Sequence, residues 1–160
     1  MDTATFQDLY AAHSRDVYRF ARWLAGSDDA AADITAETFF RAWAGREAIR
    51  VATAKAYLLA IARNLARDRQ RAARRWAGAT MPERAVPPDA EARLDLDRAL
   101  AAVRALPEAY RDPLMLAASG VGYDEIGRML GLQAGTVKIR VHRARLMLTS
   151  AAVRPGEKRR

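Results

Sequence analysis

The residues with the clearest chemistry lie in a basic stretch, KIRVHRAR at 138–145. If this stretch is an α-helix, Val137, Val141 and Ala144 fall within one narrow arc, because successive residues turn by 100°. The opposite arc carries Gly135, Ile139, His142 and Arg143, with Lys138 and Arg145 beside them. Such a helix fits the major groove of B-DNA, where cations hold phosphates and other side chains contact base edges. The pattern predicts a DNA-reading helix; the alternative is a basic amphipathic helix that is merely solvated.

A second short helix is expected directly before it, in residues 123–130 (YDEIGRML). Tyr123, Ile126 and Leu130 follow the three- and four-residue steps of one apolar stripe. Two acidic residues occupy the first turn, where the helix dipole favours negative charge. Gly131 supplies the left-handed residue that commonly follows a helix. Two short helices joined by such a turn, the second of them basic, are typical of a helix-turn-helix.

The charge distribution also points to nucleic acid. Residues 46–76 and residues 133–160 each carry a formal charge of +7, whereas residues 1–45 sum to −3 and the whole chain to +8. Two separated basic blocks suit two contact points on one long polyanion. A membrane surface would also attract cations, but neither block pairs its basic face with the large apolar face that insertion needs. We therefore expect no direct membrane insertion.

Length and composition limit the fold class. The chain has 160 residues, of which 51% are hydrophobic, and β-branched residues are sparse and isolated. These features predict an all-α fold. Since cysteine is absent, neither disulfides nor thiolate metal sites can form. No N-terminal apolar run resembles a signal peptide, so we expect a cytoplasmic location.

A stretch containing three prolines, GATMPERAVPPDAEAR at 78–93, divides the chain. Proline disfavours helix and few large apolar residues are present, so we expect a flexible linker between two small helical domains. The expected domains are residues 1–77 and 94–152, followed by a basic tail at 153–160. Within the second domain, Pro113 is expected to kink a helix or to delay its start.

Three segments in order resemble one protein family: DAAADITAETFFRAW (29–43), KAYLLAIARNLARDRQRAARR (55–75) and LPEAYRDPLMLAASGVGYDEIGRMLGLQAGTVKIRVHRAR (106–145). Together they resemble bacterial RNA polymerase sigma factors of the extracytoplasmic-function (ECF) group of the sigma-70 family, which keep only sigma regions 2 and 4. The resemblance implies a non-enzymatic factor that binds core RNA polymerase and directs promoter-specific transcription initiation. Region 2 would recognise the −10 element and region 4, the helix-turn-helix domain, the −35 element. An anti-sigma factor is implied as a further partner.

The resemblance assigns polymerase binding to one face of the helix expected at about 28–44. Asp33, Glu37 and Arg41 lie one turn apart, and Phe40 adds apolar surface beside them. Two carboxylates one turn apart also suit acid–base catalysis, but no nearby histidine, cysteine or glycine-rich loop completes such a site. A plain solvated helix face is the other alternative.

For the −10 element, the resemblance indicates the loop from Arg46 to Tyr57 and the basic helix after it. The residues matched are Arg50, Thr53, Tyr57, Arg63, Asn64, Arg67, Arg69 and Arg71. Cations in such positions neutralise phosphates, and a pocket must offset the cost of extruding a base. Only Tyr57 and Trp76 offer stacking faces, so we expect weak melting ability.

For the −35 element, the matched residues are Gln133, Gly135, Thr136, Lys138, Ile139, Arg140, His142 and Arg143. Family members usually have serine or threonine just before this helix, where this chain has Gln133 and Ala134, so a weaker helix cap is expected. Gln133 can instead bond adenine or phosphate, and His142 is equally a neutral spacer. The other histidine, His13, falls in the first domain, so neither a metal site nor a cofactor is expected.

Two other function classes fit parts of the sequence. A helix-turn-helix transcription regulator that does not act through core polymerase would use residues 123–148 alone, and leaves 29–43 and 55–75 unexplained. A nucleic-acid-modifying enzyme would need a catalytic constellation that these residues do not form. No small-molecule substrate is expected.

Overall fold

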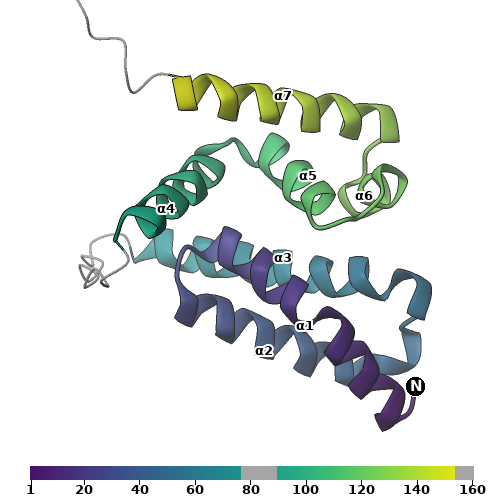
Figure 1. The fold of residues 1–160 in the computed structure, drawn as a ribbon. Coiled ribbons are helices and arrows are strands. Elements are labelled where there is room, and N and C mark those ends of the chain that lie inside the picture. Colours follow the sequence, from purple (N-terminus) through teal and green to yellow (C-terminus); the bar gives the residue numbers. More distant parts are fainter. Residues whose placement is uncertain (77–89, 154–160) are drawn as a thin grey trace, which may run out of the picture.

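The computed structural model describes residues 1–76 and 90–153, with side chains described for 1–76 and 94–151. Within these residues it contains seven α-helices, two short 3-10 helices and no strand, which confirms the all-α fold class. The helices form two groups, α1–α3 and α4–α7, and the first group lies below the second in Figure 1.

The first group consists of α1 (Thr3–Ala25), α2 (Asp28–Ala44) and α3 (Ala54–Arg75). Local caps set the first boundaries: the Asp2 carboxylate accepts a hydrogen bond from the Thr5 amide at 2.8 Å, and the Ser27 hydroxyl accepts one from the Ala30 amide at 3.2 Å. Gly26, at φ +79°, ends α1 in the left-handed conformation. The short turn that follows brings α2 back along α1, and α3 packs against both.

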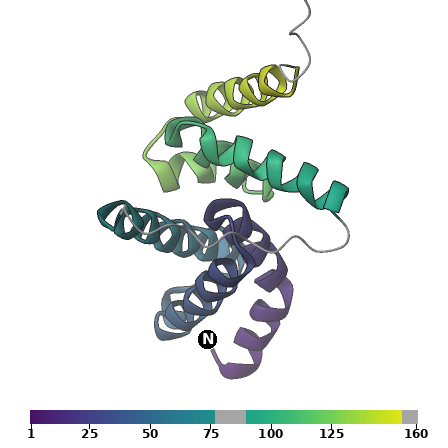
Figure 2. The same ribbon diagram turned by 90° about the vertical axis from the view of Figure 1, so that its left-hand side faces the viewer.

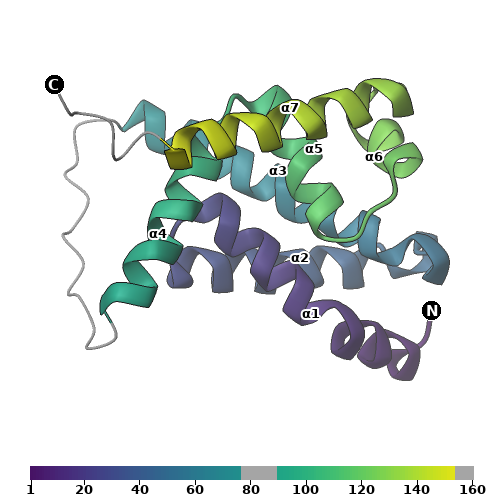
Figure 3. The same ribbon diagram turned by 45° about the horizontal axis from the view of Figure 1, so that its top comes forward.

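The second group consists of α4 (Ala90–Ala105), α5 (Glu108–Ala118), α6 (Tyr123–Leu130) and α7 (Ala134–Val153). Gly131 ends α6 at φ +68° and donates its amide to the carbonyl of Gly127, which confirms the predicted left-handed residue of the helix-turn-helix. In Figure 3, α7 crosses over α5, and these two helices pack together.

Two details of the second group differ from the sequence-based expectation. The linker expected over residues 78–93 is too long, because α4 begins at Ala90; residues 90–93 read AEAR, which are helix-favouring types once Pro88 is passed. Residues 78–89 lie outside the described residues, as do 154–160 of the expected tail, and α7 ends at Val153. Of the two effects expected of Pro113, the delayed start does not occur, because α5 begins at Glu108 and continues through the buried proline; the kink stays a prediction.

One continuous hydrophobic core joins the two groups. Large buried side chains of α1–α3 and of α5–α7 belong to a single cluster, including Phe20, Ile34, Leu58, Leu59, Met115, Leu116, Ile126, Val137 and Val141. In addition α4 contacts α1, and α6 contacts α3. The two groups are therefore packed against each other, with α7 on the far side from α3 (Figures 1 and 2).

Candidate nucleic-acid and polymerase interfaces

Helix α7 is held by one face and exposed on the other, as its sequence predicts. Val137, Val141 and Ala144 are completely or almost completely buried against α5 and α6. The opposite face exposes Gln133, Gly135, Lys138, Ile139, His142 and Arg143, whereas Thr136 and Arg140 are half-buried. Ile139 is 52% exposed and gives this otherwise charged and polar face one apolar contact point.

The turn between α6 and α7 is closed by a backbone hydrogen bond. The amide of Leu132 donates to the carbonyl of Gly127 at 2.8 Å, and the amide of Val137 donates to the carbonyl of Gln133 at 3.1 Å as α7 begins. The first turn of α7 therefore forms although Gln133 and Ala134 stand where the resemblance led us to expect a hydroxyl residue.

The candidate polymerase-binding face lies on α2. The Arg41 Nε atom is 2.7 Å from Glu37 Oε1, and an Arg69 terminal nitrogen on α3 is 3.7 Å from Asp33 Oδ2. Phe40 is 69% exposed beside these charges, while the neighbouring Phe39 is buried and stacks edge-on with Tyr10. The face combines charged groups with an exposed aromatic ring, as protein-binding surfaces commonly do.

The loop between α2 and α3 contains two short 3-10 helices, η1 (Arg46–Ala48) and η2 (Val51–Thr53). Arg46 anchors the start of the loop, because its guanidinium lies 4.1 Å from the centre of the Trp43 ring and donates to the Trp43 carbonyl. Ile49 is buried below the loop, whereas Arg50, Val51 and Thr53 are exposed. The loop is thus fixed at its base and presents its outer residues to solvent.

Helix α3 separates the predicted −10 residues into three sets. Tyr57, Asn64 and Arg71 follow seven-residue steps and share one exposed face. Arg69 points to α2, where it lies beside Asp33. Arg63 and Arg67 point to the second group of helices and form ion pairs there.

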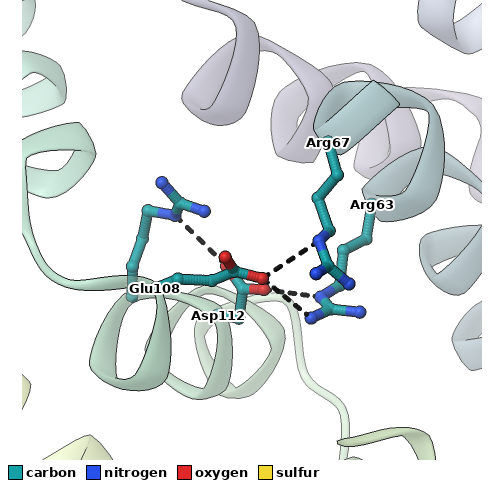
Figure 4. A network of polar contacts seen from close by, with 5 residues as sticks. Arg63, Arg67, Glu108 and Asp112 are labelled. Carbon is teal, nitrogen blue, oxygen red and sulfur yellow. Dashed lines mark hydrogen bonds and ion pairs between the residues drawn. The ribbon is translucent and has the colours of Figure 1, made fainter. Parts of the chain in front are cut away.

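Figure 4 shows these ion pairs between α3 and the first turns of α5. Arg63 Nε lies 2.5 Å from Asp112 Oδ2, and its terminal nitrogen lies 3.4 Å from Glu108 Oε1. Arg67 Nε lies 3.0 Å from the same Glu108 oxygen. The Arg111 guanidinium donates to the other Asp112 oxygen at 3.1 Å, so Asp112 is held from both sides.

Comparisons with known proteins identify the two groups of helices. Residues 9–76 match the family model for sigma-70 region 2, and residues 96–148 match the model for sigma-70 region 4. The ECF RNA polymerase sigma factor SigL of Mycobacterium tuberculosis is 32% identical over 152 residues, which cover 89% of this chain and 86% of SigL. The chain belongs to the ECF group of the sigma-70 family.

Other relatives agree with this family. The ECF sigma factor SigE of Mycolicibacterium smegmatis is 34% identical over 155 residues, and the match covers 90% of this chain but only 60% of the length of SigE. The sigma factor RpoE of Bartonella quintana, solved in complex with the anti-sigma factor NepR, superimposes with a TM-score of 0.75 at 28% identity and covers 94% of this chain and 98% of RpoE. CnrH, solved with the cytosolic domain of CnrY, has the same TM-score at 24% identity and thus shares the fold.

In family terms, α1–α3 form region 2 and α4–α7 form region 4. The sequence interpretation overlooked Glu108 and Asp112, because it read the two regions as separate modules. One signal was present: Arg111 and Asp112 are charged residues directly before the apolar run PLML. In the structure both charged side chains are buried, at 9% and 3% exposed, and such groups are rarely buried unless paired.

Another charged group lies between α1 and α3 of region 2. Lys55 Nζ is 2.7 Å from Asp16 Oδ2, and this lysine hydrogen bond lowers the pKa of the Asp16 carboxyl. Burial, and then the charge of Lys55, lower the pKa of His13. These contacts stay within region 2, so His13 belongs to the packing of α1 against α3.

Among the described residues, no helix is both long and apolar enough to cross a membrane.

Proposed function

We propose that this sigma factor binds core RNA polymerase and directs transcription initiation at promoters whose −35 and −10 elements it contacts with regions 4 and 2. The observation that carries the proposal is the exposed face of α7, because its neighbours Val137 and Val141 are buried while Lys138, Ile139 and Arg143 are presented to solvent.

At the −35 element, α7 is proposed to enter the major groove. Lys138 and Arg143 are the candidates for base or phosphate contacts, and Ile139 is the candidate for contact with a thymine methyl group. Gln133, Gly135 and Thr136 lie at the N-terminal end of α7, where free backbone amides favour a phosphate. Arg140 and His142 complete the proposed surface.

At the −10 element, the proposed contacts are Arg50 and Thr53 in the loop and Tyr57, Asn64 and Arg71 on the exposed face of α3. Arg63 and Arg67 join them once they leave their carboxylate partners on α5. Arg69 is the least favourable of the sequence-based candidates, since it lies beside Asp33 on α2. The cations of this loop and helix suit a track for the DNA backbone, and the exposed rings of Tyr57 and Trp76 offer positions for base stacking.

The proposed polymerase contact is the α2 face formed by Asp33, Glu37, Phe40 and Arg41. Its ion pairs are exposed, with side-chain exposures of 53% for Arg41 and 42% for Glu37, and exposed pairs add little to folding stability. These charged residues therefore contribute little to the stability of the fold, which favours a role in binding a partner. Phe40 gives the face an apolar centre of the kind found in protein interfaces.

An anti-sigma factor is proposed as a second protein partner, on the basis that RpoE of Bartonella quintana, which has a similar fold, was solved with one. A cytoplasmic location is proposed because the proposed partners, core polymerase and promoter DNA, are found there. No catalytic role is proposed for any residue.

Run-off transcription tests the proposal. Purified chain is added to core polymerase on a library of promoter fragments, and discrete transcripts that need both components are expected. A helix-turn-helix regulator that does not act through core polymerase would bind DNA but would give no factor-dependent start and no co-purification with core enzyme. That result would reject the proposal.

A further inference from the structure

The C-terminal end of α3, residues 71–76 (RAARRW), extends past the bundle that the rest of the helix helps to form. Leu58 and Leu65 are buried in the core of region 2, whereas every residue from 71 to 76 is exposed and Trp76 is 81% exposed. In Figure 2 this dark teal end of the helix projects beyond α1 and α2. We refer to residues 71–76 as the overhang. Since it buries nothing, the overhang does not serve the packing of region 2.

The cations of α3 form two sets. Those along the body of the helix have carboxylate partners: Lys55 with Asp16, Arg63 with Asp112, Arg67 with Glu108, and Arg69 with Asp33. Those of the overhang are Arg71, Arg74 and Arg75, and they form no ion pair with any residue that the structure describes. Three positive charges without a counter-charge in one short segment favour an anionic partner from outside the chain.

The helix dipole explains only part of this arrangement. Cations are favoured in the last turn of a helix, where Arg74 and Arg75 lie. Arg71 precedes that turn, and the effect of the dipole falls off within one turn. Stabilisation of the helix end therefore leaves Arg71 unexplained, and it does not require Arg75 to lie on any particular face.

The overhang continues the face of α3 that is proposed for the −10 element. Tyr57, Asn64 and Arg71 follow seven-residue steps along this face. Arg75 lies one further turn along, within about 40° of Arg71 at 100° per residue. From Tyr57 to Arg75 the helix rises about 27 Å, the length of about eight base pairs of duplex. Asp68, the one carboxylate of α3, is exposed between Asn64 and Arg71, so the cations of the overhang form a separate contact.

The direction of the chain indicates which part of the DNA the overhang meets. From Trp76 the chain continues through residues 77–89 to region 4, which is proposed to read the −35 element upstream of the −10 element. The C-terminal end of α3 is therefore the end nearest the duplex between the two elements.

We propose that Arg74 and Arg75, continuing from Arg71, bind phosphates of the duplex directly upstream of the −10 element, whatever its base sequence. Guanidinium groups that contact only phosphates add affinity and fix the position of the protein, but they carry no sequence information. This inference rests on the proposed function for the position of the −10 element. The surface itself rests on the unpaired arginines and on their exposure.

Two DNA fragments from a promoter with a factor-dependent start test the inference. They are identical from the −10 element downstream, with the non-template strand of that element unpaired. The short fragment ends at the upstream edge of the element, and the long fragment adds one turn of duplex, about ten base pairs of random sequence. Affinity for the complex of factor and core polymerase is measured at several salt concentrations. The ratio of the two affinities is the readout, because weaker folding or polymerase binding affects both fragments equally.

We expect the unmodified chain to bind the long fragment about three- to tenfold more tightly, and Arg74→Gln with Arg75→Gln to remove most of that gain. The slope of log affinity against log salt on the long fragment should fall by about two, since each lost phosphate contact removes about one. Arg74→Lys with Arg75→Lys should keep the gain, because a phosphate contact needs the charge. Arg15→Gln with Arg98→Gln, which removes two exposed arginines from α1 and α4, is the matched control and should keep it too.

The inference is rejected if the unmodified chain shows no gain, if the gain survives in the double glutamine variant of the overhang, or if the control loses as much. In each case the proposed function stands as long as binding and transcription depend on core enzyme. If no factor-dependent start is found, the proposed function is rejected. Binding of the free chain to the random duplex then decides: a salt slope lower by about two in the overhang variant keeps the surface, and an unchanged slope rejects it.

Discussion

Gly127 lies directly against the carbonyl oxygen of Leu132 in the turn of the helix-turn-helix. A Cβ atom on residue 127 would be 2.5 Å from that oxygen, a distance that real side chains essentially never adopt. The same carbonyl belongs to the residue whose amide donates to Gly127 at 2.8 Å. The angle between α6 and α7 thus depends on the missing side chain of one buried glycine.

Replacing Gly127 with alanine should therefore destabilise the chain by about 1–3 kcal/mol, because the backbone of the turn must shift to accommodate a methyl group. The free energy of unfolding in urea measures this cost, and −35 DNA binding should fall with it. Gly135→Ala is the matched stability control, since a Cβ there meets nothing within 4 Å. Equal stability of the two variants would show that the turn tolerates the methyl group.

Replacing Lys138 or Arg143 with alanine should weaken binding to −35 promoter DNA by about 1–3 kcal/mol, because each side chain is exposed on the proposed reading face of α7. Fluorescence anisotropy with a labelled duplex measures the change. Arg98→Ala on α4 removes a cation whose side chain is 78% exposed and away from that face, so it should leave affinity almost unchanged. If Arg98→Ala weakens binding as much as the α7 variants do, the affinity depends only on the net charge of the protein, and α7 does not read the DNA sequence.

Replacing both Asp33 and Glu37 with alanine should weaken association with core polymerase while the melting temperature changes little, because their ion pairs are exposed. Phe40→Ala should weaken it further, since the ring is solvent-exposed in the free factor. Co-purification with core enzyme measures both effects. Asp8→Ala on α1 is the control for loss of a surface carboxylate. Unchanged polymerase affinity in the double variant would place the docking surface elsewhere.

Replacing Arg71 with alanine should reduce open-complex formation on a promoter more than replacing Arg69, although both are cations near the same end of α3. Arg71 lies on the exposed face with Tyr57 and Asn64, whereas Arg69 lies beside Asp33. Permanganate footprinting of the melted −10 segment measures the difference. A larger loss for Arg69→Ala would mean that the DNA follows the α2 side of α3.

Folding stability should fall as the pH is lowered below about 6.5, the ordinary pKa of histidine. Burial and the neighbouring Lys55 lower the pKa of His13 in the folded chain, so the unfolded chain takes up the proton first and gains stability as the pH falls. Urea midpoints at pH 7.5 and 5.5 measure the change. Asp16 does not contribute in this range, because its pKa is lowered from that of an ordinary carboxyl group and the stability it adds is lost only below about pH 4.

His13→Gln should reduce that pH dependence, because it removes the imidazole whose pKa is lowered in the folded chain. If the dependence between pH 7.5 and 5.5 survives in His13→Gln, its source is another group.

The sequence alone determined the helices and the two faces of α7. Helix periodicity and end signals act over three to five residues, so Val137, Val141 and Ala144 define the packed arc of α7 and Gly131 marks the end of α6 without knowledge of the rest of the chain. The same reasoning placed Asp33, Glu37 and Arg41 on one face of α2, and three ordered segments carried the resemblance to the family.

Tertiary packing decided which cations of α3 face solvent and which face region 4. Arg63 and Asp112 are 49 residues apart, and no local pattern links them, since their contact depends on how α5 packs against α3. A helix wheel places Arg63, Arg67, Arg69 and Arg71 on several faces but does not say what covers each face. The contact itself arises because the apolar sides of both regions share one core, which brings the acidic turns of α5 onto the basic helix.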